Sequence, residues 1–282
     1  MSKEKIIEAY RKFLVANSDA ERAIQEKRYL YSDLDHYGVS VWKRREFYQQ
    51  YQKEISSLSK KEAIELAQHS WSDDYFEVRA FALSVLEINS SKLDISDIPL
   101  IEKFMRESKG WAFLDSLIIP LMPSILEKDK EAYQYLKKWI GDDDFWVRRS
   151  ALLAQLLLFR KGKGDKIPRS FVRGIPSDKL DSRSPTRHKS PDSIARNKKL
   201  FFNMAESQFD ESWIDEVYKD KHMRSRAKFF IRKAIGWTLR EMSVKDPESV
   251  AEFLKKNKNK MSGLSFKEGS RKLPEKLKKQ LG

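Results

Sequence analysis

The sequence predicts an all-α protein, and three observations support this fold class. Apolar residues recur at spacings of three and four in one segment after another, as they do on one face of a helix. Short polar breaks separate these segments. No stretch shows a convincing alternation with the period of two that is typical of a half-buried strand. We therefore expect helices of roughly ten to twenty residues joined by short turns.

The N-terminal helices can be placed from their apolar spacing and their capping residues. Residues 3–30 have helical spacing, and the polar residues 17–19 divide them into two helices. Gly38 is expected to end the next turn. Helices are then predicted over residues 40–51 and 59–71, because each segment opens with a serine, which is a favoured N-cap residue.

The segment from Lys109 to Arg149 contains the first candidate site residues. Trp111 and Asp115 are four residues apart, so a helix would place them one turn apart on the same face. An aromatic ring beside a carboxylate suits a group that develops positive charge. Arg149 follows on a later helix, and the sequence alone does not show that these three side chains converge.

An internal repeat indicates how the helices are organised. Val78-Arg79 recurs 69 residues later as Val147-Arg148, with a third copy at Ile231-Arg232. Self-similarity on this scale is typical of a stacked helical solenoid, and the pattern resembles HEAT repeats. We expect a single HEAT-like-repeat domain over residues 1–282, with a concave basic groove.

The repeat also distinguishes two neighbouring arginines. Arg148 occupies the repeated position, so a structural contact between repeats is its better interpretation. Arg149 corresponds to Ala80 in one copy and to Lys233 in another. Since the repeat does not require Arg149, that residue is the better candidate for a ligand contact.

The positive charge is concentrated in two segments. Residues 161–199 hold twelve Lys or Arg against four Asp, with four prolines and three glycines, which predicts a flexible basic insertion. Residues 255–279 hold ten Lys or Arg against two Glu. Each segment therefore carries +8, which leaves the rest of the chain at −2 within the total of +14. This pattern favours contact with a phosphate backbone, with a solubilising tail as the alternative.

Composition narrows the class of protein further. With a pI of about 9.6, an anionic partner is expected, nucleic acid first and an anionic membrane surface second. The absence of cysteine excludes disulfides, thiolate zinc sites and a cysteine nucleophile. The N-terminus resembles no signal peptide, and the longest apolar run, residues 117–121, is too short to span a bilayer. We expect a soluble intracellular protein.

No motif indicates a cofactor. The chain has no Walker loop, no dinucleotide-binding glycine pattern and no His-Glu-x-x-His, and its four histidines lack ligand spacing. Residues 142–144 are three consecutive aspartates that could hold a cation, but capping of the helix near Phe145 is the favoured interpretation. We predict no metal and no organic cofactor.

Two further residues admit both a structural and a functional interpretation. Asp115 lies in an otherwise apolar helix, and burial of a carboxylate without a partner costs roughly several kcal/mol. It is therefore exposed, paired or functional, and the sequence does not choose among these. Gly236 precedes Trp237 within a predicted helix, where glycine is unfavourable. Its presence indicates that another backbone packs closely against the helix at this point, either that of a neighbouring helix or that of a ligand.

Taken together, these residues resemble a known family. The chain resembles the AlkD-type bacterial DNA alkylation repair proteins, alkylpurine DNA glycosylases built from HEAT-like repeats. The resemblance is most specific in residues 229–241 and clear in residues 139–151, with weaker support from Arg28-Tyr29 upstream of Gly38-Val39. The insertion at 161–199 and the pair Ala112-Phe113 depart from the familiar shorter members.

The resemblance implies a role for individual residues. Asp115, Trp111 and Trp237 match the family's catalytic positions, although aligning the first two requires a small gap before the following proline. The residues implied to contact DNA are Arg149, Tyr29, Arg240 and Lys233.

The implied reaction is hydrolysis of the N-glycosidic bond of cationic N3- or N7-alkylated purines in duplex DNA. A monofunctional glycosylase without lyase activity is expected, working as a monomer in a bacterial-type cytoplasm, near the nucleoid, without a protein partner or membrane. Two alternatives stay open: a non-catalytic relative that binds branched or bent DNA, and a HEAT-type protein-interaction scaffold.

Overall fold

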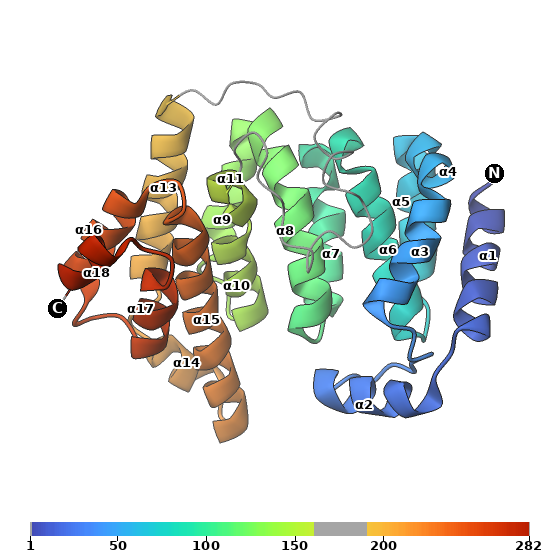
Figure 1. The fold of residues 1–282 in the computed structure, drawn as a ribbon, viewed down its shortest axis with the longest axis horizontal. Coiled ribbons are helices and arrows are strands. Elements are labelled where there is room, and N and C mark those ends of the chain that lie inside the picture. Colours follow the sequence, from blue (N-terminus) through green and yellow to red (C-terminus); the bar gives the residue numbers. More distant parts are fainter. Residues whose placement is uncertain (1, 161–190, 282) are drawn as a thin grey trace. The chain divides into compact units, whose positions relative to one another are not determined.

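The protein is helical throughout the residues that its computed structural model describes, which are 2–160 and 191–281 (Figure 1). Within these residues the one trace of β-structure is an isolated parallel bridge between Asp35 and Tyr75. The all-α prediction is confirmed. The described residues form two compact units, residues 2–128 and residues 129–160 with 191–281. The expectation of a single repeat domain stays a prediction.

The first unit is built from paired helices in which α5 packs on α6 and α6 packs on α8. Its elements are α1 (Lys3–Ala16), α2 (Ala20–Leu30), α3 (Val41–Gln50), α4 (Gln52–Ser57), α5 (Lys60–Trp71), α6 (Phe76–Ile88), the 3₁₀ turns η1 (Ser90–Lys92) and η2 (Ile95–Asp97), α7 (Ile98–Glu107) and α8 (Trp111–Lys128). The predicted boundaries near residues 17–19, 40 and 59 are confirmed to within one or two residues.

The second unit is organised around its longest helix, α15, which packs against α10 on one side and against α17 on another. Its elements are η3 (Lys130–Ala132), α9 (Tyr133–Trp139), α10 (Phe145–Leu153), α11 (Leu156–Arg160), α13 (Pro191–Glu206), α14 (Ser212–Val217), α15 (Lys221–Met242), α16 (Pro247–Asn257), α17 (Gly263–Ser270) and α18 (Glu275–Lys279).

Side-chain caps explain where many of these helices begin. Ser59 and Glu62 form a complete capping box at α5, in which each side chain accepts a hydrogen bond from the other residue's backbone N–H. Asp144 accepts a hydrogen bond from the backbone N–H of Trp146 at 2.8 Å. The interpretation of residues 142–144 as the cap of the helix at Phe145 is therefore confirmed.

Gly38 allows the turn before α3 to pack against the start of α2. Its φ of +76° lies in the left-handed region, which favours glycine. A Cβ at this position would lie 2.0 Å from the carbonyl oxygen of Asp19. No other residue fits here without displacing the backbone.

Aromatic side chains form the centre of the first unit's core. The ring of Tyr10 lies 4.4 Å from that of Phe81 and 4.8 Å from that of Phe47, measured between centroids. Its hydroxyl lies 3.1 Å from the hydroxyl of Tyr48. These helices are thus joined by large buried rings whose polar groups are satisfied.

Arg79 and Arg148 have a structural role, but their Nε hydrogen bonds lie within one repeat, whereas the repeat pattern predicted a contact between repeats. The Nε of Arg79 donates to the backbone carbonyl of Asp73, six residues earlier, at 2.6 Å. The Nε of Arg148 donates to the carbonyl of Asp142, also six residues earlier. In both copies the arginine therefore closes the turn that leads into its own helix.

The arginines also contact neighbouring elements. The guanidinium of Arg148 lies 3.6 Å over the ring centroid of Trp213 on α14. Arg232, in the third copy, forms a bidentate ion pair with Glu211 at 2.7 and 2.6 Å. The third copy thus uses a carboxylate where the others use a carbonyl.

The predicted insertion at 161–199 needs a correction at its C-terminal side. Residues 191–199 form the first part of α13, so helical structure resumes before the predicted end of the insertion. Pro191 and the basic residues of this part had suggested a break, but Pro191 is the first residue of the helix, a position where proline is well tolerated. Residues 161–190 lie outside the described part of the chain.

Across the described residues, no helix combines the length and the apolar character that a membrane span requires.

Candidate functional site

The start of α8 brings two predicted site residues onto one helix. Trp111 is its first residue, and Asp115 follows one turn later, as the spacing predicted. Asp115 is buried, with 6% of its surface exposed, whereas Trp111 is partly exposed. Of the three alternatives for Asp115, which were an exposed, a paired or a functional carboxylate, the first is therefore excluded.

Tyr29 on α2 adds an aromatic side chain to this position. Its ring meets that of Trp111 edge-on, with 6.1 Å between centroids and an interplanar angle of 83°. Tyr29 itself is 69% exposed, so packing within the protein does not account for its large apolar surface. The first unit therefore unites Tyr29 with Trp111, and α8 places Asp115 one turn away.

A small apolar cavity of about 120 Å³ borders Trp111 within the first unit. Phe113, in its wall, stacks on Phe76 with 4.5 Å between ring centroids. Lys109 and Asp33, which also line the cavity, form an exposed ion pair at 2.7 Å. Phe113, one of the departures from the family pattern, thus forms part of the hydrophobic wall beside the candidate site.

In the second unit, Arg149 is buried on α10, with 3% of its surface exposed. Its Nη1 donates to the backbone carbonyl of Phe230 on α15 at 2.7 Å, and its guanidinium lies 5.3 Å from that residue's ring centroid. Arg149 thus connects α10 to α15 in addition to any ligand contact. The repeat pattern had not revealed this structural role, because the partner is a backbone atom of a distant helix.

Lys233, Trp237 and Arg240 follow one another along α15 at spacings of four and three, so they share one face of the helix. Arg240 forms an ion pair with Glu268 on α17, and Lys233 lies 3.9 Å from the same carboxylate. Arg240 and Lys233, which are both predicted to contact DNA, therefore share the carboxylate of Glu268.

Gly236 explains why α17 can approach this face. A Cβ at Gly236 would lie 2.7 Å from the Cβ of Glu268 and 3.0 Å from the carbonyl oxygen of Ser265. Of the two interpretations of Gly236, close packing by a neighbouring helix is the one that the structure supports.

The carboxylates do not cancel the positive charge of this face. Glu241 binds Lys272 at 3.0 Å and lies 3.4 Å from Arg240. Arg271 lies 3.9 Å from Glu268. Two carboxylates thus face four cations, which are Lys233, Arg240, Arg271 and Lys272, and the network retains a surplus of positive charge.

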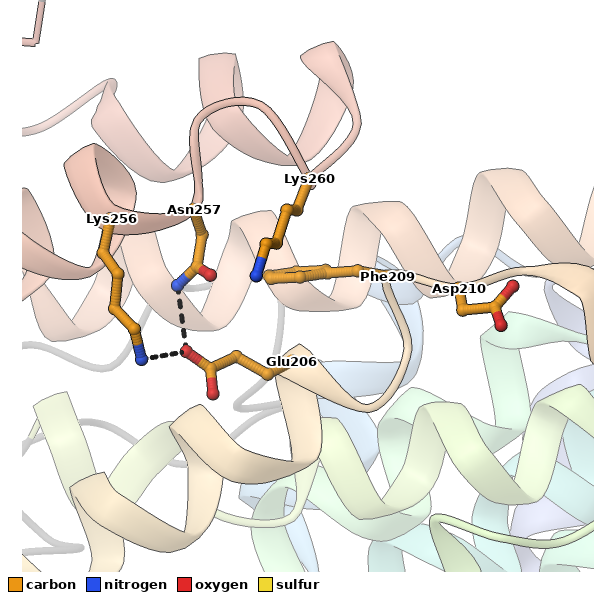
Figure 2. Close-up of a pocket in the computed structure, with 6 residues that line it drawn as sticks. All are labelled: Glu206, Phe209, Asp210, Lys256, Asn257 and Lys260. Carbon is orange, nitrogen blue, oxygen red and sulfur yellow. Dashed lines mark hydrogen bonds and ion pairs between the residues drawn. The ribbon is translucent and has the colours of Figure 1, made fainter.

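A second hollow, in the second unit, was not predicted from the sequence. It has a volume of about 470 Å³ and is lined by Glu206, Phe209, Asp210, Lys256, Asn257 and Lys260. Figure 2 shows Lys256 and Asn257 pointing to Glu206, at 2.9 and 3.0 Å, and the amino group of Lys260 beside the ring of Phe209. The only sequence signal for this hollow is the basic segment 255–279, which supplies both lysines.

The predicted site residues thus fall into two sets. Tyr29, Trp111 and Asp115 belong to the first unit, whereas Arg149, Lys233, Trp237 and Arg240 belong to the second. The convergence of the two sets on one ligand stays a prediction.

Comparisons with known proteins show what this chain is similar to. A solved structure described as a predicted DNA alkylation repair enzyme from Enterococcus faecalis has the same fold, with a TM-score of 0.66 at 19% identity. The match covers 92% of this chain and 98% of that one. No curated protein matches. The family model described as DNA alkylation repair enzyme matches residues 10–177 and 201–273. Because that match spans most of the sequence, the chain belongs to the DNA alkylation repair enzyme family.

Proposed function

We propose that the protein is a monofunctional DNA glycosylase that hydrolyses the N-glycosidic bond of cationic N3- or N7-alkylated purines in duplex DNA. Its family membership supports a role in DNA alkylation repair. The observation that carries the finer proposal is Asp115, a buried carboxylate one helical turn from Trp111, whose ring meets Tyr29.

The chemistry follows from the charge of the lesion. An alkylated purine of this kind is cationic, so it leaves as a neutral base when the bond from C1′ to the ring nitrogen breaks and the electron pair moves to the base. The sugar then carries positive charge as an oxocarbenium ion. Asp115 stabilises that cation electrostatically, and it orients the attacking water and accepts the proton that the water releases. Burial strengthens this interaction because little solvent screens it.

The aromatic residues and the arginines have complementary tasks in this proposal. Trp111 packs on the deoxyribose and favours its cationic form, as does Trp237. Arg149 binds a flanking phosphate, and Arg240 and Lys233 support it. Tyr29, whose ring meets that of Trp111, contacts the DNA backbone.

The test is release of methylated purines from N-methylated duplex DNA under single-turnover conditions, with wild type and Asp115→Asn. We expect wild type to release the bases and the variant to lose about 100-fold or more in rate. The matched control is Asp97→Asn, which alters another buried aspartate of the first unit, one that pairs with Lys60 at 2.8 Å. This control should retain the wild-type rate.

Each other result has a definite meaning. Equal release by wild type and Asp115→Asn would retain the enzyme and reject the carboxylate. No release by a folded wild type that binds duplex DNA would replace the glycosylase with a binder of branched or bent DNA. A chain that binds duplex weakly, without steep salt dependence, would indicate a protein-interaction scaffold.

A second test concerns strand cleavage. A bifunctional enzyme needs an amine that forms a Schiff base with the sugar. Lys109, two residues before Trp111, instead contacts Asp33 at 2.7 Å. We therefore expect no covalent complex when the reaction is treated with borohydride, and a trapped protein–DNA adduct would contradict the monofunctional assignment.

A further inference from the structure

A buried polar cluster in the first unit lies apart from the residues assigned above. It consists of Glu26 on α2, His36 in the segment between α2 and α3, and Glu77 on α6. One ring nitrogen of His36 and one carboxylate oxygen of each glutamate lie within 4.8 Å of one another. Imidazole nitrogen and carboxylate oxygen are ligands that zinc binds readily.

His36 is the residue that calls for an explanation. Its side chain is only 1% exposed, and neither ring nitrogen has a hydrogen-bond partner. The nearest carboxylate oxygen, on Glu26, lies 3.9 Å from Nδ1, which is too far for a hydrogen bond. Burial of a polar group without a partner costs about 1–3 kcal/mol, so a native chain is expected to supply a partner for this ring.

The surroundings hold the ring and one carboxylate in place. The imidazole stacks on Phe76, with 4.7 Å between centroids and an interplanar angle of 9°, which leaves its in-plane nitrogens free to bind a ligand. Glu77 is completely buried and accepts hydrogen bonds from the backbone N–H groups of Tyr37, Gly38 and Val39 at 3.1, 2.9 and 3.1 Å. Such outer contacts are typical of metal-binding carboxylates, which are oriented by donors behind them.

Glu26 has the geometry of a more mobile ligand. One of its oxygens accepts from Arg22 at 2.7 Å, and the other is the one that faces His36. Its side chain is 19% exposed, which provides a route from solvent to the cluster. A carboxylate that binds an arginine through one oxygen can still coordinate an ion through the other.

We propose that Glu26, His36 and Glu77 bind one zinc ion, with water as the remaining ligand. Zinc bonds of about 2.0–2.2 Å place tetrahedral ligand atoms roughly 3.3 Å apart. Some of these atoms must therefore approach by up to about 1.5 Å when the ion binds, from as much as 4.8 Å to roughly 3.3 Å. This requires movement of the Glu26 side chain and of the segment that carries His36 toward Glu77. The imidazole coordinates as the neutral ring, through the lone pair that has no partner in its absence.

Arg44 is the feature that opposes a cation here. It is buried, and its Nε and Nη1 have no hydrogen-bond partner. Arg44 interacts electrostatically with Glu26 and Glu77, and Arg22 with Glu26, so these arginines already balance the charge of the two carboxylates and a zinc ion adds a surplus of positive charge. The affinity of the site is therefore set by competition between zinc and this guanidinium, and removal of Arg44 tightens zinc binding.

The ion would serve to position α2. No residue of that helix is fully buried, so apolar packing contributes little to holding it. A bond from Glu26 through zinc to Glu77 joins α2 to α6. Since Tyr29 follows Glu26 by three residues on the same helix, the bond also steadies the ring that meets Trp111. The ion would thus hold residues in position and take no part in the chemical step.

The experiment is a titration of the untagged, metal-free chain with Zn²⁺. Calorimetry measures binding, and the thermal unfolding temperature measures the effect of the ion on stability. We expect one zinc per chain and a higher unfolding temperature, with no comparable effect of Mg²⁺. His36→Phe keeps the stack on Phe76 while removing both nitrogens, and Glu26→Gln removes a partly exposed ligand. Each should weaken zinc binding by at least about 100-fold, the upper end of the effect of losing an outer contact.

The matched controls are His69→Gln and Glu21→Gln, since both residues are exposed and lie on α5 and α2. They should bind zinc as wild type does, whereas Arg44→Met should bind it more tightly. A wild-type chain that binds no zinc, or a His36→Phe chain that binds it equally, would overturn the proposal. Because the readout is binding and unfolding of the protein alone, it does not depend on glycosylase activity.

Discussion

Arg148 and Arg149 are neighbours with different structural partners. The repeat pattern separated them correctly as far as Arg148 is concerned, because that residue closes its own turn as Arg79 does. For Arg149 the structure adds a bond to the carbonyl of Phe230 that no pattern along the chain revealed. One residue can therefore be assigned from periodicity, and the other requires knowledge of which helix lies beside it.

Replacing Arg148 should reduce stability without affecting DNA binding. Arg148→Met removes the bond to Asp142 and the cation–π contact with Trp213, and together these should lower the free energy of unfolding by about 1–3 kcal/mol. Urea denaturation measures the change. Lys137→Met, an exposed substitution on α9, should stay within about 0.5 kcal/mol of wild type. Equal stability of the two variants would refute the structural role of Arg148.

Asp246 predicts a pH dependence of stability in the second unit. Partial burial raises the pKa of its carboxyl, but hydrogen bonds from Lys198 and Ser249 outweigh this and leave the pKa below its usual range. A lowered pKa in the folded state means that the charged form stabilises the fold. This contribution is complete above the unfolded pKa, near 3.9, and is lost as the pH falls through the lower folded value.

Asp246→Asn isolates that charge, because asparagine can still cap α16 but cannot pair with Lys198. At pH 7 the free energy of unfolding of the variant should be about 1 kcal/mol lower than that of wild type. The difference should shrink when urea unfolding is repeated below about pH 4. A difference that is the same at both pH values would show that the ion pair does not carry it.

At the scale of elements, helix boundaries and helix contacts follow different rules. The starts of α2, α3, α5 and α10 were predicted because each depends on a capping residue within a few positions. The start of α13 was missed because Pro191 and the basic residues after it also suit a loop. The pairing of α15 with α17 was indicated by Gly236 as a close approach, but the identity of the partner came only from the structure.

Gly236 gives a direct test of that packing. In Gly236→Ala, the added Cβ collides with Glu268 and with the backbone of Ser265, so α17 must move. Overpacking of this kind costs about 1–3 kcal/mol and should outweigh the helix preference of alanine, which is about 1 kcal/mol. Gly263→Ala is the matched control, since its Cβ meets no atom within 4 Å. Thermal unfolding should separate the two variants, and a Gly236→Ala chain more stable than wild type would contradict the packing argument.

At the scale of the whole molecule, the distribution of charge predicts how the protein meets DNA. Two segments carry the entire positive surplus, and one of them includes residues 163–189, with eight Lys or Arg and three Asp. Their side chains are expected to displace counterions from phosphates, and each phosphate contact contributes about 0.9 to the slope of log affinity against log salt concentration.

Replacing residues 163–189 with a Gly/Ser linker of equal length should weaken duplex binding and reduce that slope. The replacement stops before α13, so it leaves the described helices intact. Single-turnover excision at saturating enzyme should be nearly unchanged, because the proposed reaction uses Asp115 and Trp111 instead. A collapse in the excision rate, measured alongside a salt titration of binding, would assign the segment a part in the chemistry.

The sequence by itself determined the fold class, most helix boundaries, the repeat and a face of α8 that carries Trp111 and Asp115. These features arise from hydrogen bonds and side-chain spacing within a few residues, so they can be read along the chain. Only the tertiary structure decided that Asp115 is buried and that Arg240 and Lys233 share Glu268.

The cluster of Glu26, His36 and Glu77 was also revealed only by the tertiary structure. His36 lies ten residues after Glu26 and Glu77 follows 41 residues later, with no spacing that marks a metal site. Their proximity depends on how α2, the turn at Gly38 and α6 pack together. Packing between helices is set by side chains far apart in sequence, and for that reason it escapes any pattern that is read locally.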